Sequence, residues 1–128
     1  MRSEKGFSIV ELLIAITLLA IGLLAVAGMQ SVAINSNSWA NKLSTATSLA
    51  QEVMEDILAK DATDAIFSAT ATAPYDLDPG SISNNISISG AGTFSATRTI
   101  TINTPVAGTV MIDVRVTDGT RTVTLAGY

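Results

Sequence analysis

The chain contains no cysteine and no histidine among its 128 residues. Without cysteine there are no disulfide bonds and no thiol nucleophiles, and without histidine the most common general base and zinc ligand is missing. A serine or threonine nucleophile would have to use a lysine or a carboxylate as its base. We therefore expect no enzymatic activity, no catalytic residue, no metal site and no cofactor.

Charged side chains are also scarce, at 14% of the sequence, and none lies between Glu11 and Lys42. After the first six residues, five basic residues stand against ten carboxylates, so no basic surface suggests contact with nucleic acid. A chain of this length is expected to form one domain, and its folded part is small because a long apolar segment takes up much of the sequence.

That apolar segment is Leu12–Met29, eighteen residues whose only polar side chain is Thr17. As an α-helix it would be about 27 Å long, close to the roughly 30 Å of a bilayer's hydrocarbon core. Arg2 and Lys5 precede it and favour a cytoplasmic N-terminus. The segment is thus long enough to cross a membrane once.

Hydropathy alone leaves three interpretations open: a secretory signal, an uncleaved membrane anchor and a buried core helix. Ala25-Val26-Ala27 supports the first, since cleavage after Ala27 would release a small secreted β-rich binding domain. Glu11 argues against it, because secretory signals carry basic or neutral residues at this position. A core helix would have polar residues on one face, and this segment has no such face.

Residues 5–15 read Lys-Gly-Phe-Ser-Ile-Val-Glu-Leu-Leu-Ile-Ala. This segment resembles the class III signal of type IV prepilins and type II secretion pseudopilins: a basic leader ending in glycine, then phenylalanine, a carboxylate fifth in the mature chain, and an apolar helix. The resemblance implies that a prepilin peptidase cleaves between Gly6 and Phe7 and methylates the new Phe7 amino group. It also implies that Glu11 pairs with the Phe7 amino group of a neighbouring subunit or of its own chain during assembly.

The same resemblance implies a domain organisation and a location. Residues 1–6 would be the leader peptide, 7–30 the hydrophobic transmembrane and filament-core helix, and 31–128 the amphipathic half of the helix with a β-sheet head. The subunit would cross the inner membrane once, with a periplasmic head, before it enters a pilus or pseudopilus filament. Its partners would be other pilin subunits through helix packing, the prepilin peptidase, an inner-membrane assembly platform and membrane lipid.

Residues 20–30 are most similar to minor pilins of the PilV kind, whose anchors continue with Gly-Leu-Leu and end in Leu-Gln or Met-Gln. Many major pilins carry a proline in the second half of the anchor, and here no proline precedes Pro74. The expected function is therefore that of a minor pilin, a structural subunit of a type IV pilus. A type II secretion pseudopilin is the alternative within the family.

Apolar residues continue beyond the anchor on one stripe of a helix. They are Leu43, Ala46, Leu49, Ala50, Val53, Met54, Ile57 and Leu58. The pattern predicts one helix from residue 7 to about residue 59, apolar in its first half and amphipathic in its second. Asparagine and serine at residues 35–38 are poor helix formers and indicate a locally soft point.

The last third of the chain predicts about four antiparallel strands, over residues 82–89, 94–103, 110–116 and 121–125. Residues 60–81 would form the connecting loop. Arg98 lies on the apolar side of its strand and indicates an edge or an end of the sheet. The sheet would pack on the amphipathic half of the helix in an α+β, pilin-like fold.

Asp118-Gly119 is typical of a two-residue hairpin turn. Folding the chain about this turn would place Val114 opposite Val123 and Ile112 opposite Leu125. Both strands would then show one apolar face in register.

Two further features leave alternatives open. The segment Asp76-Leu77-Asp78-Pro79-Gly80 superficially resembles a calcium loop, but it lacks a third alternate oxygen ligand and the distal glutamate, which favours a solvated turn. Trp39 fits either a residue at the membrane interface or a packing residue.

Overall fold

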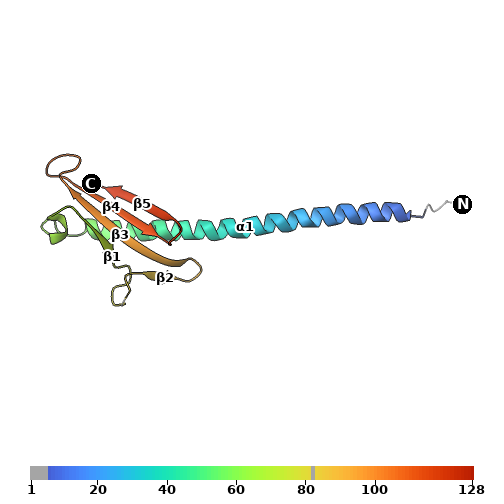
Figure 1. Cartoon of the computed structure of the whole chain (residues 1–128), viewed down its shortest axis with the longest axis horizontal. Coiled ribbons are helices and arrows are strands. Elements are labelled where there is room, and N and C mark those ends of the chain that lie inside the picture. The colour runs from blue at the N-terminus through green and yellow to red at the C-terminus, as the bar shows by residue number, and fades with distance from the viewer. Residues whose placement is uncertain (1–5, 82) are drawn as a thin grey trace. The chain divides into compact units, whose positions relative to one another are not determined.

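The computed structural model describes residues 6–81 and 83–128. Among these residues the elements are the helix α1 (Ile9–Leu58), the short 3-10 helix η1 (Ala65–Phe67) and the strands β1 (Ala71–Tyr75), β2 (Ile86–Ile88), β3 (Gly92–Ile102), β4 (Val110–Thr117) and β5 (Thr122–Gly127) (Figure 1). The chain divides into an N-terminal unit that ends at Asn37 and a second unit, Ser38–Tyr128, which we call the head.

The helix α1 has 50 residues and confirms the long helix that the sequence predicts. It continues without a break through residues 35–38. At its C-terminal end the Ala59 N–H still donates to the Glu55 carbonyl at 2.9 Å, whereas the Lys60 N–H donates to the Ile57 carbonyl at 3.2 Å. A tighter last turn of this kind commonly closes an α-helix.

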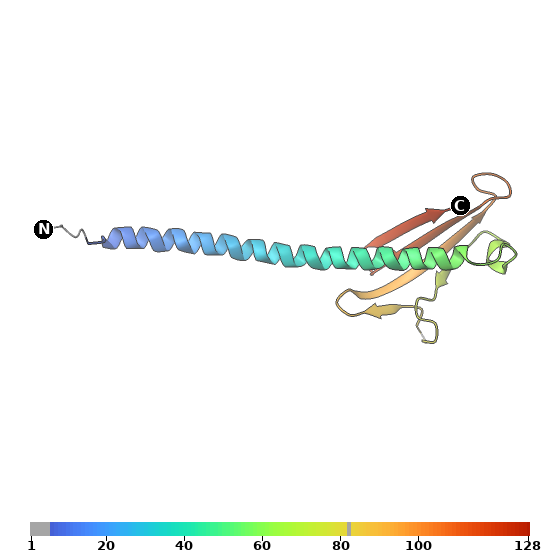
Figure 2. The same cartoon turned by 180° about the vertical axis from the view of Figure 1, so that it is seen from behind.

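In the head, α1 packs one apolar stripe against one face of the sheet (Figure 2). The buried residues of this stripe are Ala46, Leu49, Ala50, Val53, Met54 and Ile57. The sheet and the turn between β2 and β3 contribute Ala91, Phe94, Ala96, Ile100, Ile112, Val114 and Val116 to the same core. The head is therefore one helix layer on one sheet layer, an α+β architecture of the pilin type.

The sheet is antiparallel, with the order β1-β3-β4-β5. The short strand β2 pairs with the first residues of β3, and β1 pairs with β3 farther along. The turn between β2 and β3 is tied to the helix, because the Asn41 side-chain amide donates to the Gly90 carbonyl at 3.1 Å. Gly90 has a positive φ of 79°, which favours glycine at this position.

The sheet has five strands where the sequence predicted about four. The additional strand, β1, lies within residues 60–81, which we expected to form a loop. Its Pro74 argued against a strand, because proline cannot donate a ladder hydrogen bond. An edge strand accommodates proline, however, and β1 lies at the edge of the sheet.

The predicted strand over 82–89 is too long at its start. The observed strand β2 begins at Ile86. The N–H groups of Ser83 and Asn85 donate to the hydroxyls of Ser81 and Ser83, each at 3.3 Å. Local bonds of this kind compete with strand pairing. Ile82 lies outside the described residues.

The predicted register of the β4–β5 hairpin is wrong by two residues. Val114 lies opposite Leu125 and Val116 opposite Val123, whereas the sequence predicted Val114 opposite Val123 and Ile112 opposite Leu125. Side chains alternate between the two faces of a strand, so a shift of two residues leaves every side chain on its predicted face. The prediction of one shared apolar face is therefore confirmed.

The loop explains the shift. Thr117 pairs with Thr122, so four residues connect the strands instead of two. Within this loop, Oδ1 of Asp118 accepts the N–H groups of Thr120 and Arg121 at 2.9 and 2.7 Å. An aspartate that binds the backbone two and three residues ahead stabilises a longer turn than the dipeptide alone indicates.

The expectation that Arg98 marks a sheet edge or end is wrong. Its strand, β3, pairs with β1 on one side and with β4 on the other, where Arg98 lies opposite Ala73 and Val114. Arg98 is half-buried, and its charge helps to lower the pKa of Asp56 on α1, after the larger effects of a hydrogen bond from Tyr75 and of Lys60. The direct partners of Asp56 are Tyr75 and Lys60.

The edge strand β1 is held to α1 by the Tyr75 hydroxyl, which donates to Oδ2 of Asp56 at 2.6 Å. Nζ of Lys60 lies 3.4 Å from the same oxygen. Burial, followed by the bond to Asp56 and its negative charge, raises the pKa of Tyr75 to about 12. The neutral phenol is thus favoured in the folded state.

We predict that alanine substitutions at two neighbouring residues of α1 change the stability of the head by unequal amounts. Ile57 is fully buried, whereas Leu58 is 54% exposed. Ile57→Ala should lower the free energy of unfolding by about 2–5 kcal/mol, since it leaves a cavity, and Leu58→Ala should change it by only about 0.5 kcal/mol. Urea unfolding of the detergent-solubilised chain, followed by circular dichroism, measures both. Equal losses in the two variants would contradict the assigned helix face.

The raised pKa of Tyr75 predicts a loss of stability at high pH. Its contribution should be complete below about pH 10, the ordinary tyrosine pKa, and should be lost as pH rises through about 12. A phenolate absorbance titration should show a component near pH 12 that disappears in Tyr75→Phe and persists in Tyr128→Phe. A component that survives Tyr75→Phe would show that another group produces it.

Candidate functional site

The residues that directly precede the first turn of α1 are Gly6, Phe7 and Ser8. The Ser8 hydroxyl accepts the Val10 N–H at 3.3 Å, and the Ser8 carbonyl accepts the Leu12 N–H at 3.1 Å. Ser8 is therefore the N-cap, which satisfies donors that a helix leaves free at its start. Gly6 and Phe7 lie outside the helix, and Phe7 is 80% exposed.

Glu11 lies in the first turn of α1, where the positive end of the helix dipole favours a carboxylate. Ser8 and Glu11 have the spacing of a capping box, in which the glutamate would accept the Ser8 N–H. Among residues 6–81 and 83–128, however, the Glu11 carboxylate has neither a hydrogen-bond donor nor an ion-pair partner. The part of the chain that the structure describes therefore provides no counter-charge for this exposed carboxylate.

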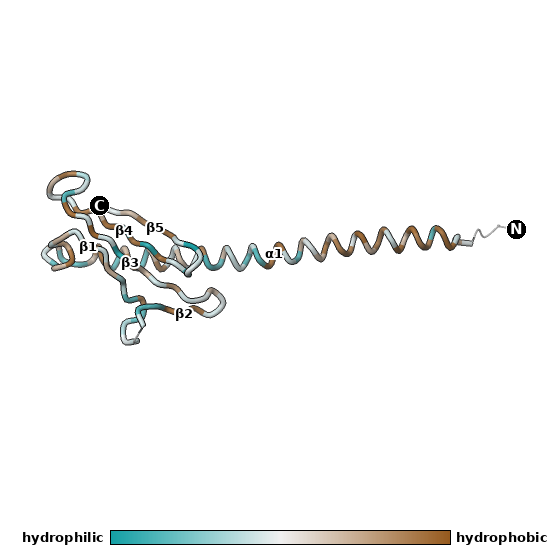
Figure 3. Tube along the Cα trace, in the orientation of Figure 1, coloured by the Kyte–Doolittle hydropathy of each residue, from teal (hydrophilic) through white to brown (hydrophobic). Residues whose placement is uncertain are grey.

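The residues that follow Glu11 are mostly hydrophobic, which Figure 3 shows as the predominantly brown stretch of α1, and their exposed side chains form an apolar surface. Every large apolar side chain from Phe7 to Ile34 is at least 53% exposed. The one polar side chain of Leu12–Met29 is satisfied within the helix, because the Thr17 hydroxyl donates to the Leu13 carbonyl at 2.8 Å. By length and composition, α1 contains a segment that could cross a membrane.

This apolar surface requires a non-aqueous partner. Full burial of one large apolar side chain contributes about 1.5–3 kcal/mol, and the helix of the N-terminal unit exposes such residues from Ile9 to Ile34. Lipid tails or the apolar helices of other subunits would provide that burial. The sequence predicted this surface correctly, since hydropathy reports it directly.

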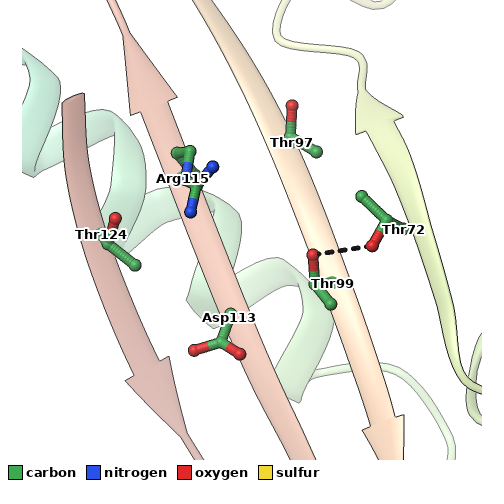
Figure 4. Close-up of a pocket in the computed structure, with 6 residues that line it drawn as sticks. All are labelled: Thr72, Thr97, Thr99, Asp113, Arg115 and Thr124. Carbon is green, nitrogen blue, oxygen red and sulfur yellow. Dashed lines mark hydrogen bonds between the residues drawn. The ribbon is translucent and has the colours of Figure 1, made fainter. Parts of the chain in front are cut away.

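A second surface lies on the face of the sheet that α1 does not cover, where side chains from four strands surround a hollow of about 460 Å³ (Figure 4). They are Thr72, Thr97, Thr99, Asp113, Arg115 and Thr124. Thr72 and Thr99 share a hydrogen bond of 3.0 Å across β1 and β3. Sequence reasoning missed this hollow because β1 was not predicted, although alternating threonines in β3 and β5 were a signal for a polar outer face.

One carboxylate of the possible calcium loop accepts a hydrogen bond within the loop. Oδ1 of Asp76 accepts the Asp78 N–H at 3.0 Å, which closes a turn of the chain on itself. Within the described part of the chain, no three carboxylate side chains gather in a group able to hold a metal ion.

Comparison with known proteins bears on the N-terminal segment. Residues 1–27 match the family model described as the prokaryotic N-terminal methylation motif. No curated protein and no solved structure matches the chain significantly. Proteins with this motif form a family of structural subunits, and the motif implies processing by a prepilin peptidase and assembly into filaments. The chain thus carries the class III N-terminal signal characteristic of type IV pilins and pseudopilins, on a pilin-like α+β architecture.

Proposed function

We propose that this protein is a minor pilin, a structural subunit that assembles through its N-terminal helix into a type IV pilus. The observation that carries the proposal is the methylation motif at residues 1–27 on a helix whose large apolar side chains are exposed up to Ile34. The function is self-association with other pilin subunits, with no catalytic step.

Processing by the prepilin peptidase would occur between Gly6 and Phe7. Both residues are exposed and precede the helix, so the bond can enter a peptidase without unfolding α1. The N-cap at Ser8 keeps the helix start intact after cleavage. Residues 1–6 would be removed, Phe7 would carry the methylated amino group, and 7–30 would remain as the anchor of residues 31–128.

The apolar half of α1 would serve in two environments in succession. It would first cross the inner membrane once, with the head in the periplasm, and the assembly platform would then move it into the filament. In both places the same side chains leave water, first among lipid tails and then among the helices of other subunits. The small residues Gly22 and Gly28 lie on this helix with open space where a side chain would stand, and they allow close helix contact.

Glu11 would neutralise the amino group of Phe7, in the same chain or in a neighbouring subunit. A charged side chain at the centre of a membrane costs about 2.5–3.5 kcal/mol on insertion scales, so an unpaired carboxylate in an apolar filament core would be unfavourable. The position of Glu11, four residues after Phe7 and without a partner among the described residues, supports this pairing.

Residues 20–30 favour a minor pilin of the PilV kind, and the alternative is a type II secretion pseudopilin that carries the same methylation motif. Deletion of the ATPase of each machine separates the two. A minor pilin needs the pilus ATPase to reach sheared filaments, whereas a pseudopilin needs the secretion ATPase.

The proposal predicts the mature N-terminus. Intact mass and N-terminal sequencing of the protein purified from membranes should show a chain that begins at methylated Phe7. A chain that begins at Gly28 would identify a secreted domain released after Ala27. A chain that retains Met1 would identify an uncleaved anchor, and either result would overturn the proposal.

Glu11→Ala should leave membrane insertion intact but lower incorporation into filaments by roughly tenfold or more, since hydrogen bonds to charged groups contribute about 1.5–3 kcal/mol. Glu55→Ala, on the exposed face of the same helix, is the matched control and should incorporate normally. An epitope on this subunit, detected in the sheared filament fraction, provides the measurement. Normal incorporation of the Glu11 variant would count against the pairing.

A further inference from the structure

The first residues of the head bring an aromatic ring and two cationic groups together. The Arg121 guanidinium carbon, from the β4–β5 loop, lies 5.3 Å from the centre of the Trp39 ring on α1. One helical turn beyond Trp39, Nζ of Lys42 lies 4.0 Å from Oδ2 of Asp118 in the same loop. We call Trp39, Lys42, Leu43 and Arg121 the Trp39 cluster.

The cluster is open to its surroundings. Trp39 is 44% exposed and Leu43 is 40% exposed, and the Lys42 side chain is 40% exposed. Arg121 is exposed as well. A cation over an indole face contributes about 0.5–1 kcal/mol at such exposed sites, so the pairing orders Arg121 without burying its charge. Both cationic groups remain able to bind an anion.

The position of the cluster in the chain fits the edge of a bilayer. Lys42 is the first charged residue after Glu11, and Trp39 follows Ile34, the last large apolar residue of the exposed segment, by five residues. The five helical residues from Ile34 to Trp39 rise about 7.5 Å. The polar headgroup layer is roughly 5–8 Å thick on each side, so Trp39 reaches this layer when Ile34 lies at the edge of the hydrocarbon core.

The charges of the head are unevenly distributed. The head carries five basic and nine acidic residues. Two of the basic residues, Lys42 and Arg121, lie in the cluster beside one carboxylate, Asp118. The rest of the head therefore has three basic and eight acidic residues. An anionic surface would attract the cluster and repel the remainder of the head.

Asp118 does not neutralise the cluster fully, because its single negative charge faces the two positive charges of Lys42 and Arg121. Its Oδ1 accepts the N–H groups of Thr120 and Arg121, and only the long 4.0 Å contact joins Oδ2 to Lys42. Lys42 can therefore exchange this contact for a phosphate oxygen without opening the loop.

We propose that the Trp39 cluster docks the head on anionic phospholipid headgroups while the subunit resides in the membrane. Arg121 and Lys42 bind the lipid phosphate, and the indole of Trp39 lies at the level of the headgroups, where tryptophan is enriched. This inference rests on the membrane stage of the proposed function. It assigns Trp39 to the interface, one of the two roles that the sequence left open.

The only tryptophan of the chain provides the test. The full chain is reconstituted into phosphatidylcholine liposomes that contain either brominated phosphatidylglycerol or brominated phosphatidylcholine, and quenching of Trp39 fluorescence is measured. At low salt we expect stronger quenching by brominated phosphatidylglycerol. Each cationic side chain should contribute a roughly fivefold preference for this lipid. The preference should fall at 0.5 M salt, because the screening length, which is about 10 Å at 0.1 M, becomes shorter as the salt concentration rises.

Matched variants separate the cluster from general charge. Arg121→Gln and Lys42→Gln should each reduce the preference severalfold, whereas Arg115→Gln makes the same change of charge on the outer sheet face and should leave it unchanged. Circular dichroism of each variant checks that the head remains folded. A preference that Arg115→Gln removes equally would overturn the proposal.

The remaining outcomes separate the inference from the function on which it rests. Liposome flotation with equal quenching by both lipids, or with none, would retain the anchor and overturn lipid docking. In that case an acidic surface of another subunit becomes the candidate partner of the cluster. Failure of the chain to float with liposomes would overturn the membrane stage and the inference together.

Discussion

The structure depends on the apolar surface of one helix, which changes character along its length. Up to Ile34 the large apolar side chains of α1 are exposed on every face, and from Ala46 to Ile57 they form one buried stripe. The hydrophobic effect is not directional, so the first part accepts any apolar surroundings. The second part needs a surface of matching shape, which the sheet provides.

The head is small, and its sheet has one apolar face. Without the stripe of α1, residues such as Phe94, Ile100 and Val114 would lose the partners that bury them. The helix that would anchor the subunit is therefore also half of the core of the head. Under the proposed function, a force on the anchor acts on an element that the fold cannot release without unfolding, which suits a subunit moved from membrane to filament.

Features that form within a single segment of the chain were predicted from the sequence, whereas features that depend on contacts between distant segments were not. Hydropathy and spacing predicted α1, its two halves and the strands around Val114, and the motif from Gly6 to Glu11 is itself a local pattern. The strand β1 was missed because its pairing with β3 overrides the signal of Pro74. Arg98 was assigned to an edge or end for a similar reason, since the sequence did not show that its strand pairs with β1 on one side and β4 on the other.

The interval between Glu11 and Lys42 contains no charged residue, and it is bounded by an acidic residue at one end and a basic residue at the other. Under the two proposals, each of these residues binds an opposite charge at a different stage. In the membrane, Lys42 and Arg121 bind lipid phosphate, contacts that are lost when the subunit leaves the bilayer. On assembly, Glu11 pairs with the amino group of Phe7 in an apolar environment, where an unpaired carboxylate would be strongly unfavourable. One end of the interval thus has a counter-charge at each stage.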